Sequence, residues 1–148
     1  MQFYALRDIK AGDQLFYSYC LVSNSFAQRQ ADLVPYGFTC KCPGCLNAIP
    51  ETDELRTTFG IKIAFFEETL LNRPKIDKIA LEGALSFEKE VLKEGLDAND
   101  EYLTLLMAIS AGYSKLGKGE ESRKYSALVE KFRKFMTDEW RGVQIPQT

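Results

Sequence analysis

The sequence predicts an α+β protein, in which a small β and cysteine-loop segment (residues 1–50) precedes an antiparallel α-helical bundle (residues 51–148). Two features of the first segment support this prediction. It is rich in aromatic residues, glycine and cysteine, and its aromatic run over residues 14–19 has the composition of a β-strand. After Pro50, apolar residues recur at steps of three and four, which is the period of an amphipathic helix.

Length and composition limit the class of protein. A chain of 148 residues can form one compact domain, or a small module plus a helical one. Its 45% apolar and 27% charged residues are typical of a soluble globular protein, and a net charge of -2 argues against direct nucleic-acid binding. No apolar run approaches the roughly 20 residues of a membrane helix, and the N-terminus does not resemble a signal peptide. We therefore expect an intracellular protein, nuclear or cytoplasmic, with no membrane partner.

The first segment carries signals for a turn, a strand and a short helix. Residues 10–13 (Lys-Ala-Gly-Asp) are typical of a turn, and the aromatic strand of residues 14–19 follows. Ser25 and Gln28 have the spacing of a capping box. We expect a short helix that begins after Ser25 and ends before Pro35, because the proline ring disfavours helix in the residue before it.

Four apolar stripes follow Pro50, each at helical spacing. Pro74, Gly95 and residues 117–119 separate them, and helices with such short connections pack as antiparallel hairpins. Residues 108–135 also resemble a tetratricopeptide unit, because small residues there permit close packing, but an ordinary bundle explains the pattern equally well. The stripes are Leu55, Phe59, Ile63, Phe66 and Leu70; Ile76, Ala80, Ala84, Val91 and Leu92; Tyr102, Leu106, Ile109, Tyr113 and Leu116; and Tyr125, Leu128, Phe132, Phe135 and Met136.

Cysteine is concentrated in one short stretch, and histidine is absent. The lack of histidine excludes Ser-His-Asp and Cys-His catalysis. Cys40, Cys42 and Cys45 lie in a loop that we expect over residues 36–46, and thiolates at this spacing can surround one Zn²⁺. Structural zinc sites have four ligands, so this cluster lacks one.

Two other interpretations of the cysteines remain open. Cys42 and Cys45 are spaced like a redox pair, or the thiols are inert. A redox pair usually opens a helix after a strand, whereas Pro50 and the polar residues 51–53 follow here. We therefore favour zinc binding.

Residues 7–19 (Arg-Asp-Ile-Lys-Ala-Gly-Asp-Gln-Leu-Phe-Tyr-Ser-Tyr) resemble the closing motif of the SET domain, an R-D-I-x-x-G-E-E-L-x-x-x-Y run. Arg29, Leu33, residues 36–38 and the Cys-x-Cys-x-x-Cys cluster resemble the junction between SET and post-SET segments in the SET and MYND domain family and in fungal SET proteins. The resemblance covers the first third of the chain and rests on the order and spacing of these pieces. The helices after Pro50 would correspond to the helical C-terminal region of such proteins.

This resemblance implies a protein-lysine N-methyltransferase, which transfers a methyl group from S-adenosylmethionine to a lysine of a histone or another protein. Tyr19 matches the catalytic tyrosine whose hydroxyl lies near the transferring methyl group. Tyr36 matches an aromatic residue of the substrate-lysine channel, and Phe38 matches a residue that packs near the cofactor. From the residues alone, Tyr19 would be an ordinary packing residue of the strand.

SET proteins also carry an upstream glycine-rich cofactor segment and an Asn-His-Ser-Cys-like motif that supplies the fourth zinc cysteine. This chain contains neither, so we expect a fragment that needs a missing N-terminal SET portion and does not catalyse alone. The strand before Cys20 would point this thiol away from the cluster. We expect Arg29 to be solvated or to pair with Asp32 or Asp13 at the surface. The alternative function is a non-catalytic zinc-binding and helical protein-interaction module.

Overall fold

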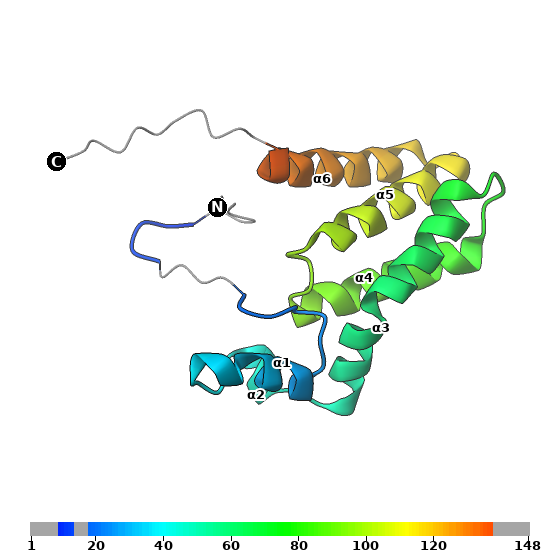
Figure 1. The fold of residues 1–148 in the computed structure, drawn as a ribbon. Helices are drawn as coiled ribbons and strands as arrows, with labels where there is room; N and C mark the ends of the chain where they lie inside the picture. The colour runs from blue at the N-terminus through cyan, green and yellow to red at the C-terminus, as the bar shows by residue number, and fades with distance from the viewer. Residues whose placement is uncertain (1–8, 14–17, 138–148) are drawn as a thin grey trace.

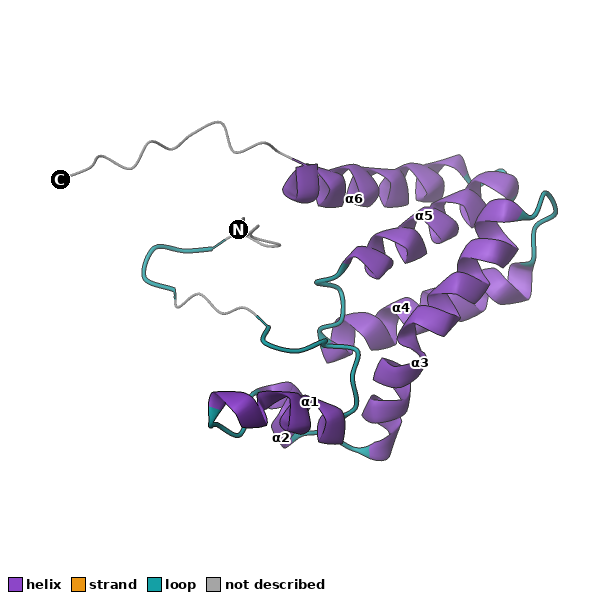
Figure 2. Cartoon of the chain, viewed as in Figure 1, coloured by secondary structure: helices purple, strands orange, loops and turns teal. Residues whose placement is uncertain are grey.

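The computed structural model describes residues 9–13 and 18–137, and every regular element in those ranges is helical (Figures 1 and 2). The described chain is therefore all-α, and the predicted α+β class is wrong. Residues 14–17 of the predicted strand lie outside the described residues, and the described end of that segment, Ser18 and Tyr19, has no strand conformation. A strand needs a paired neighbour to satisfy its backbone, and the described residues contain no strand that could pair with Ser18 and Tyr19. The elements are α1 (Phe26–Leu33), η1 (Val34–Tyr36), α2 (Pro43–Leu46), α3 (Pro50–Phe66), η2 (Glu67–Asn72), α4 (Lys78–Glu94), α5 (Asp100–Lys115) and α6 (Gly119–Thr137).

The turn and the short N-terminal helix are confirmed. Asp13 donates its backbone N–H to the Lys10 carbonyl at 3.1 Å, and Gly12 takes the left-handed φ of 94° that this turn needs. The helix α1 follows Ser25, whose hydroxyl accepts the backbone N–H of Gln28 at 3.3 Å. Only half of the capping box forms, because the Gln28 side chain donates to a carboxylate further along α1.

The helix α3 continues without a break into a wider π-helical segment, η2. The ammonium group of Lys115, at the end of α5, donates to the backbone carbonyls of Leu71 at 3.1 Å and of Leu70 and Arg73 at 2.5 Å. These carbonyls lie at a helix end, where no further turn supplies N–H donors. One lysine therefore closes η2 just before Pro74, the predicted stop.

The helices α4 and α5 end at the glycines that the sequence predicts, and a side chain caps the start of each. The side chains of Asp77 and Asn99 cap α4 and α5, since each accepts a backbone N–H three residues on, at 3.0 and 3.1 Å. Gly95 and Gly117 follow α4 and α5 with left-handed φ values of 67° and 72°.

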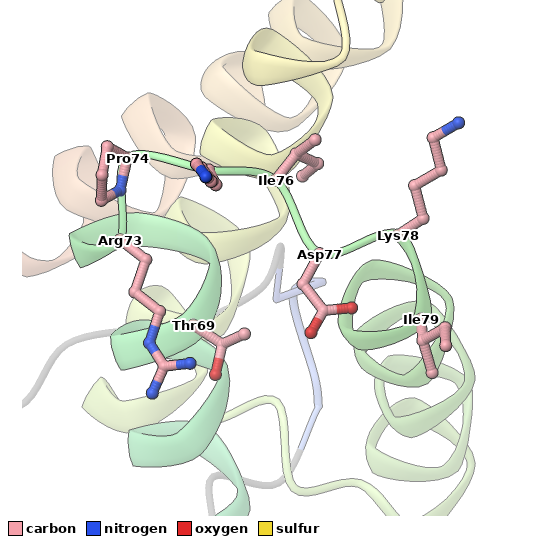
Figure 3. A pocket seen from close by; sticks show the side chains of 8 residues that line it. Thr69, Arg73, Pro74, Ile76, Asp77, Lys78 and Ile79 are labelled. Atoms are coloured by element: carbon pink, nitrogen blue, oxygen red, sulfur yellow. The ribbon is translucent and has the colours of Figure 1, made fainter.

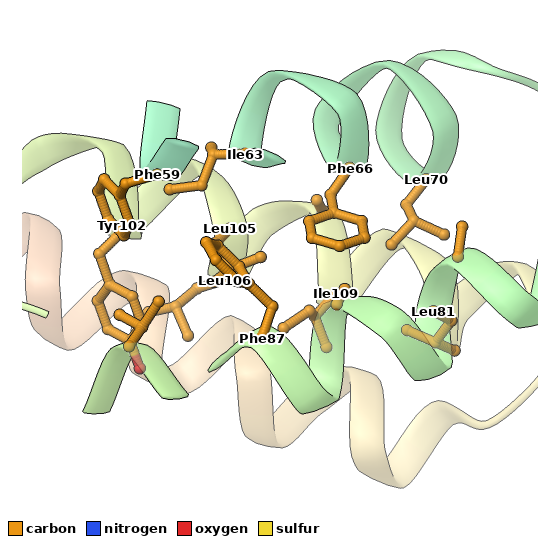
Figure 4. Close-up of a cluster of buried hydrophobic side chains, with 14 of the residues drawn as sticks. Phe59, Ile63, Phe66, Leu70, Leu81, Phe87, Tyr102, Leu105, Leu106 and Ile109 are labelled. Carbon is orange, nitrogen blue, oxygen red and sulfur yellow. The ribbon is translucent and has the colours of Figure 1, made fainter. Parts of the chain in front are cut away.

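The core lies between α3, η2, α4 and α5, as Figure 4 shows. Its aromatic centre is Phe59, Phe66 and Phe87, with the Phe87 centroid 6.0 Å from Phe59 and 5.8 Å from Phe66. The whole first stripe is buried, and α5 contributes inaccessible side chains at Leu105 and Ile109. The helical bundle is thus organised as its periodicity predicts.

Two predicted core positions are wrong. Leu92 in α4 and Leu128 in α6 are exposed, and Val129 is buried where Leu128 was expected. The side chains of Phe135 and Met136 lie outside the described part of the chain. The helices α5 and α6 lie side by side as an antiparallel hairpin (Figure 1), and its resemblance to a tetratricopeptide unit stays a prediction.

Candidate metal centre and aromatic cluster

The ring of Tyr19 contacts two aromatic side chains from a later part of the chain, Tyr36 and Phe38. The ring centroid of Tyr19 lies 5.2 Å from that of Tyr36 and 5.8 Å from that of Phe38, with interplanar angles of 62° and 77°. These edge-to-face geometries are the preferred ones for aromatic pairs. Gly37 separates Tyr36 from Phe38 in a left-handed conformation, with φ of 73°.

All three rings remain open to solvent. The exposed fractions are 46% for Tyr19, 58% for Tyr36 and 44% for Phe38. The structure thus brings together the three residues that the resemblance selected. Within the described residues they form an open wall, and the catalytic, channel and cofactor roles assigned to them stay predictions.

The three cysteines of the predicted zinc loop also lie together. The sulfur atoms of Cys40, Cys42 and Cys45 all lie within 4.8 Å of one another. Sulfur ligands about 2.3 Å from a tetrahedral Zn²⁺ would be roughly 3.8 Å apart, so only a small movement is needed for all three to bind one ion. Cys45 is buried, Cys40 is half-buried and Cys42 is exposed.

A short helix gives the cysteine loop this shape. We expected residues 36–46 to be a loop, but Pro43 starts the four-residue helix α2. Its first turn joins the backbone N–H of Cys45 to the carbonyl of Cys42 at 2.9 Å. The ring of Pro43 fixes its φ in the helical range, which suits the first position of a helix.

The thiols differ in acidity. Burial raises the pKa of Cys45 to about 11, and a hydrogen bond from Arg29 opposes that rise. Burial alone would also raise the pKa of Cys42, but hydrogen bonds from the Cys40 side chain and the Cys45 backbone bring it below its ordinary value. A metal binds thiolates rather than thiols, so Cys42 loses its proton to a metal more readily than Cys45 does.

The fourth ligand of a complete zinc site is not found among the described residues. Within the ranges that the structure covers, the candidate metal cluster consists of Cys40, Cys42 and Cys45, without a carboxylate and without Cys20. Burial and the charge of Asp32 raise the pKa of Cys20, which lies outside this cluster. The three-sulfur donor set fits zinc in its chemistry and is one ligand short.

The helix α1 holds the cysteine loop through two side chains. The amide of Gln30 pairs with the backbone of Cys40, donating to its carbonyl and accepting its N–H, both at 3.1 Å. Arg29 is 5% exposed and donates to the carbonyl of Gly44 at 3.2 Å and to the sulfur of Cys45 at 3.8 Å. The expectation that Arg29 is solvated or pairs with an aspartate is therefore wrong. One signal was available, because Arg29 precedes the buried Leu33 by four residues and so shares its helix face.

Two contacts attach α1 and the segment before it to the helical bundle. Asp53, in the first turn of α3, accepts the backbone N–H of Phe26 at 2.7 Å. Arg56, one turn further on, donates to the backbone carbonyl of Val22 at 2.6 Å. The start of α3 therefore fixes both the beginning of α1 and the segment that carries Tyr19. Figure 1 shows α1 and α2 side by side at this end of α3.

A separate cavity of about 610 Å³ lies between the end of η2 and the start of α4 (Figure 3). Among its lining residues are Thr69, Arg73 and Asp77. The Thr69 hydroxyl oxygen is buried and has no hydrogen-bond partner among the described residues. None of the residues predicted to act in catalysis or metal binding lines this cavity, so it is a distinct feature.

Comparison with known proteins gives one partial similarity. Over 62 residues the chain is 37% identical to histone-lysine N-methyltransferase SET5 of Meyerozyma guilliermondii. The match covers 41% of this chain and 13% of that protein, so the chain spans only a small part of the relative. No protein-family model matches the chain, and no solved structure matches it.

This similarity agrees with the resemblance to SET proteins at a coarse level. A segment of the chain is similar in sequence to a histone-lysine N-methyltransferase, and the geometry of the three cysteines is compatible with a bound metal ion. The narrower assignments, to the SET and MYND group and to a post-SET segment, stay predictions, as does a nuclear or cytoplasmic location. No helix in the described ranges combines the length and the apolar character that crossing a membrane requires.

Proposed function

We propose that this chain is part of a SET-family protein-lysine methyltransferase and contributes one wall of its active site. The observation that carries the proposal is the meeting of Tyr19, Tyr36 and Phe38 beside a three-cysteine cluster. A general aromatic core would not explain this group, because all three rings are substantially exposed. The partial similarity to a histone-lysine methyltransferase supports the same conclusion.

The aromatic cluster suits the chemistry of lysine methylation. The neutral ε-amine of a lysine must be aimed at the methyl group of S-adenosylmethionine, and aromatic walls remove water from it without adding charge. We assign the aiming role to the Tyr19 hydroxyl and the channel wall to Tyr36. Phe38 packs against the cofactor in this scheme. The protein substrate is a histone or another lysine-bearing protein.

The wall needs a partner segment. Tyr19, Tyr36 and Phe38 are each about half exposed, so they leave one side of any bound ligand in water. Binding sites for small molecules usually bury most of the ligand surface. We propose that a SET portion outside these 148 residues supplies the other walls, which is consistent with the small share of the relative that this chain spans.

Zinc has a structural role in this proposal. Cys40, Cys42 and Cys45 would hold the ion, and the SET portion would supply the fourth ligand. A bound Zn²⁺ would cross-link the loop that begins two residues after Phe38. The cysteine loop would then keep Tyr36 and Phe38 against Tyr19.

The test joins the chain to the SET portion of a related protein. In the joined protein, Tyr19→Phe should lower kcat by at least about tenfold with little change in S-adenosylmethionine affinity, because the hydroxyl acts at the reacting centre. Tyr113→Phe, in the helical bundle, is the matched control and should keep full turnover. Methyl transfer to a histone peptide and calorimetric titration of the cofactor give the two readouts.

Three outcomes decide between the candidates. Micromolar cofactor affinity of the 148-residue chain alone would contradict the one-wall arrangement. Undiminished turnover of Tyr19→Phe would remove Tyr19 from the active site. A joined protein that is folded and binds zinc but never transfers a methyl group would favour the non-catalytic interaction module.

A further inference from the structure

Arg29 is a buried cation that faces the metal centre. Its guanidinium donates to the sulfur of Cys45 at 3.8 Å, to the carbonyl of Gly44 at 3.2 Å and to the carbonyl of Asn24 at 2.5 Å. No carboxylate pairs with Arg29 in the ion pairs of the described chain. Of the three groups to which Arg29 donates, the Cys45 sulfur is therefore the one that can carry a negative charge.

A Zn²⁺ ion held by the three cysteines would leave excess negative charge close to Arg29. Three thiolates carry more negative charge than one Zn²⁺ neutralises, and a fourth thiolate would increase the excess. Cys45 is the buried member of the cluster, so the excess charge there is poorly solvated by water. A guanidinium that is itself 5% exposed interacts with such a charge more strongly than a solvated one would.

We propose that Arg29 is a positioning residue of the cysteine metal site, which offsets the charge of the metal–thiolate complex and fixes the sulfur of Cys45 toward the ion. This inference rests on the zinc site of the proposed function. The planar fork of arginine allows both actions, since one guanidinium contacts the sulfur and two backbone carbonyls together. Metal binding and the docking of α1 on the cysteine loop are then one coupled event.

A purely mechanical role for Arg29 makes a different prediction. If Arg29 only ties Asn24 and Gly44 together, its removal loosens the loop without a special effect on the charge of the complex. Lysine retains the charge but not the fork, whereas methionine retains neither. The two replacements therefore separate charge from loop geometry.

The experiment measures Zn²⁺ affinity by competition with a chromophoric chelator, in the full chain and in Arg29→Met and Arg29→Lys. Arg29→Met should bind zinc about 10- to 100-fold more weakly, as expected for loss of a group that supports a metal ligand. Arg29→Lys should recover a large part of this loss. Titration with Co²⁺ gives a second readout, because the thiolate-to-cobalt absorption band of Arg29→Met should weaken as Cys45 coordinates less fully.

Arg56→Met is the matched control. Arg56 is also buried, and a Cβ placed on Gly44 would lie 3.0 Å from its guanidinium, so it packs against the same loop without bonding a sulfur. Its zinc affinity should stay close to that of the unmodified chain. Circular dichroism shows whether each variant is folded. If Arg29→Met does not fold, Arg29→Lys still tests the inference.

Each result has a definite meaning. A zinc affinity of Arg29→Met equal to that of the unmodified chain would overturn the inference and leave the zinc site intact. An equal loss of zinc affinity in Arg29→Lys and Arg29→Met would show that Arg29 only packs against the loop. The same conclusion would follow if Arg56→Met lost as much zinc affinity as Arg29→Met. An unmodified chain that binds no zinc would overturn the metal site itself, together with this role for Arg29.

Discussion

Arg56 Nη2 lies 2.7 Å from Glu94 Oε1, and this pair joins the beginning of α3 to the last residue of α4. The two side chains are 7% and 17% exposed. Arg56 also donates to the backbone carbonyls of Val22 and Glu94, at 2.6 and 3.3 Å. One buried arginine therefore connects the segment after Tyr19 to two helices of the bundle.

Arg56→Met should lower the free energy of unfolding by about 3 kcal/mol, because it leaves the Glu94 carboxylate without its partner in a mostly buried place. Urea unfolding followed by circular dichroism measures the change. Arg133→Met is the control, since the Arg133–Glu130 pair is exposed and should contribute less than about 1 kcal/mol. Similar losses in the two variants would show that the buried pair has no special role.

A second buried carboxylate links three helices. Glu88 of α4 is 7% exposed and accepts hydrogen bonds from the hydroxyls of Tyr102 at 3.2 Å and Tyr125 at 2.6 Å. Burial, together with the charge of Glu88 and the hydrogen bonds to it, raises the pKa of both tyrosines above the ordinary value of 10.0. The folded state therefore holds these phenol protons more tightly than the unfolded state does.

The raised pKa values predict a loss of stability in alkali. Below pH 10.0 both states keep the phenol protons of Tyr102 and Tyr125. As the pH rises above that value the unfolded state releases them first, so the free energy of unfolding falls. The double variant Tyr102→Phe/Tyr125→Phe should show a shallower fall, measured by urea unfolding at several pH values. Parallel curves for the two proteins would contradict the linkage.

Close packing at Gly112 makes a third prediction. A Cβ at Gly112 would lie 3.0 Å from Leu81 Cδ1 and 3.6 Å from Leu70 Cδ2, both in the core. Overpacking costs about 1–3 kcal/mol, which exceeds the gain of about 1 kcal/mol from replacing a helical glycine. Gly112→Ala should therefore lower the melting temperature. Gly83→Ala should raise it, because its Cβ would meet only Phe66 at an ordinary 3.5 Å. A higher melting temperature for both variants would show that the Leu81 side chain can move aside.

The helical part of the fold could be predicted from the sequence because each signal acts locally. Gly95 and Gly117 end their helices through their own backbone conformation, and the stripe from Leu55 to Leu70 has the helical period. The burial of Val129 in place of Leu128 could not be predicted in this way. Both are apolar neighbours, and the side of α6 that faces α5 depends on how the two helices pack.

The predicted strand and the cysteine cluster show where local signals are insufficient. The aromatic composition of residues 14–19 suits a strand, but a strand forms only against a partner that the same residues cannot specify. The approach of Tyr19 to Tyr36 was expected from a resemblance and not from spacing. The burial of Arg29 depends on the position of α2, because its partners Gly44 and Cys45 belong to that helix.

Serine variants of two cysteines test the metal centre. Cys42→Ser should abolish zinc binding, because two remaining thiolates are too few for a structural site, whereas Cys20→Ser should retain about one zinc ion per chain. Elemental analysis after purification without a chelator measures both. The helical signal should persist in Cys42→Ser, since the core between α3 and α5 contains no cysteine among its described members. Equal loss of zinc from both variants would show that Cys20 is also a ligand. Zinc retained by Cys42→Ser would show that the three-cysteine cluster does not bind the ion.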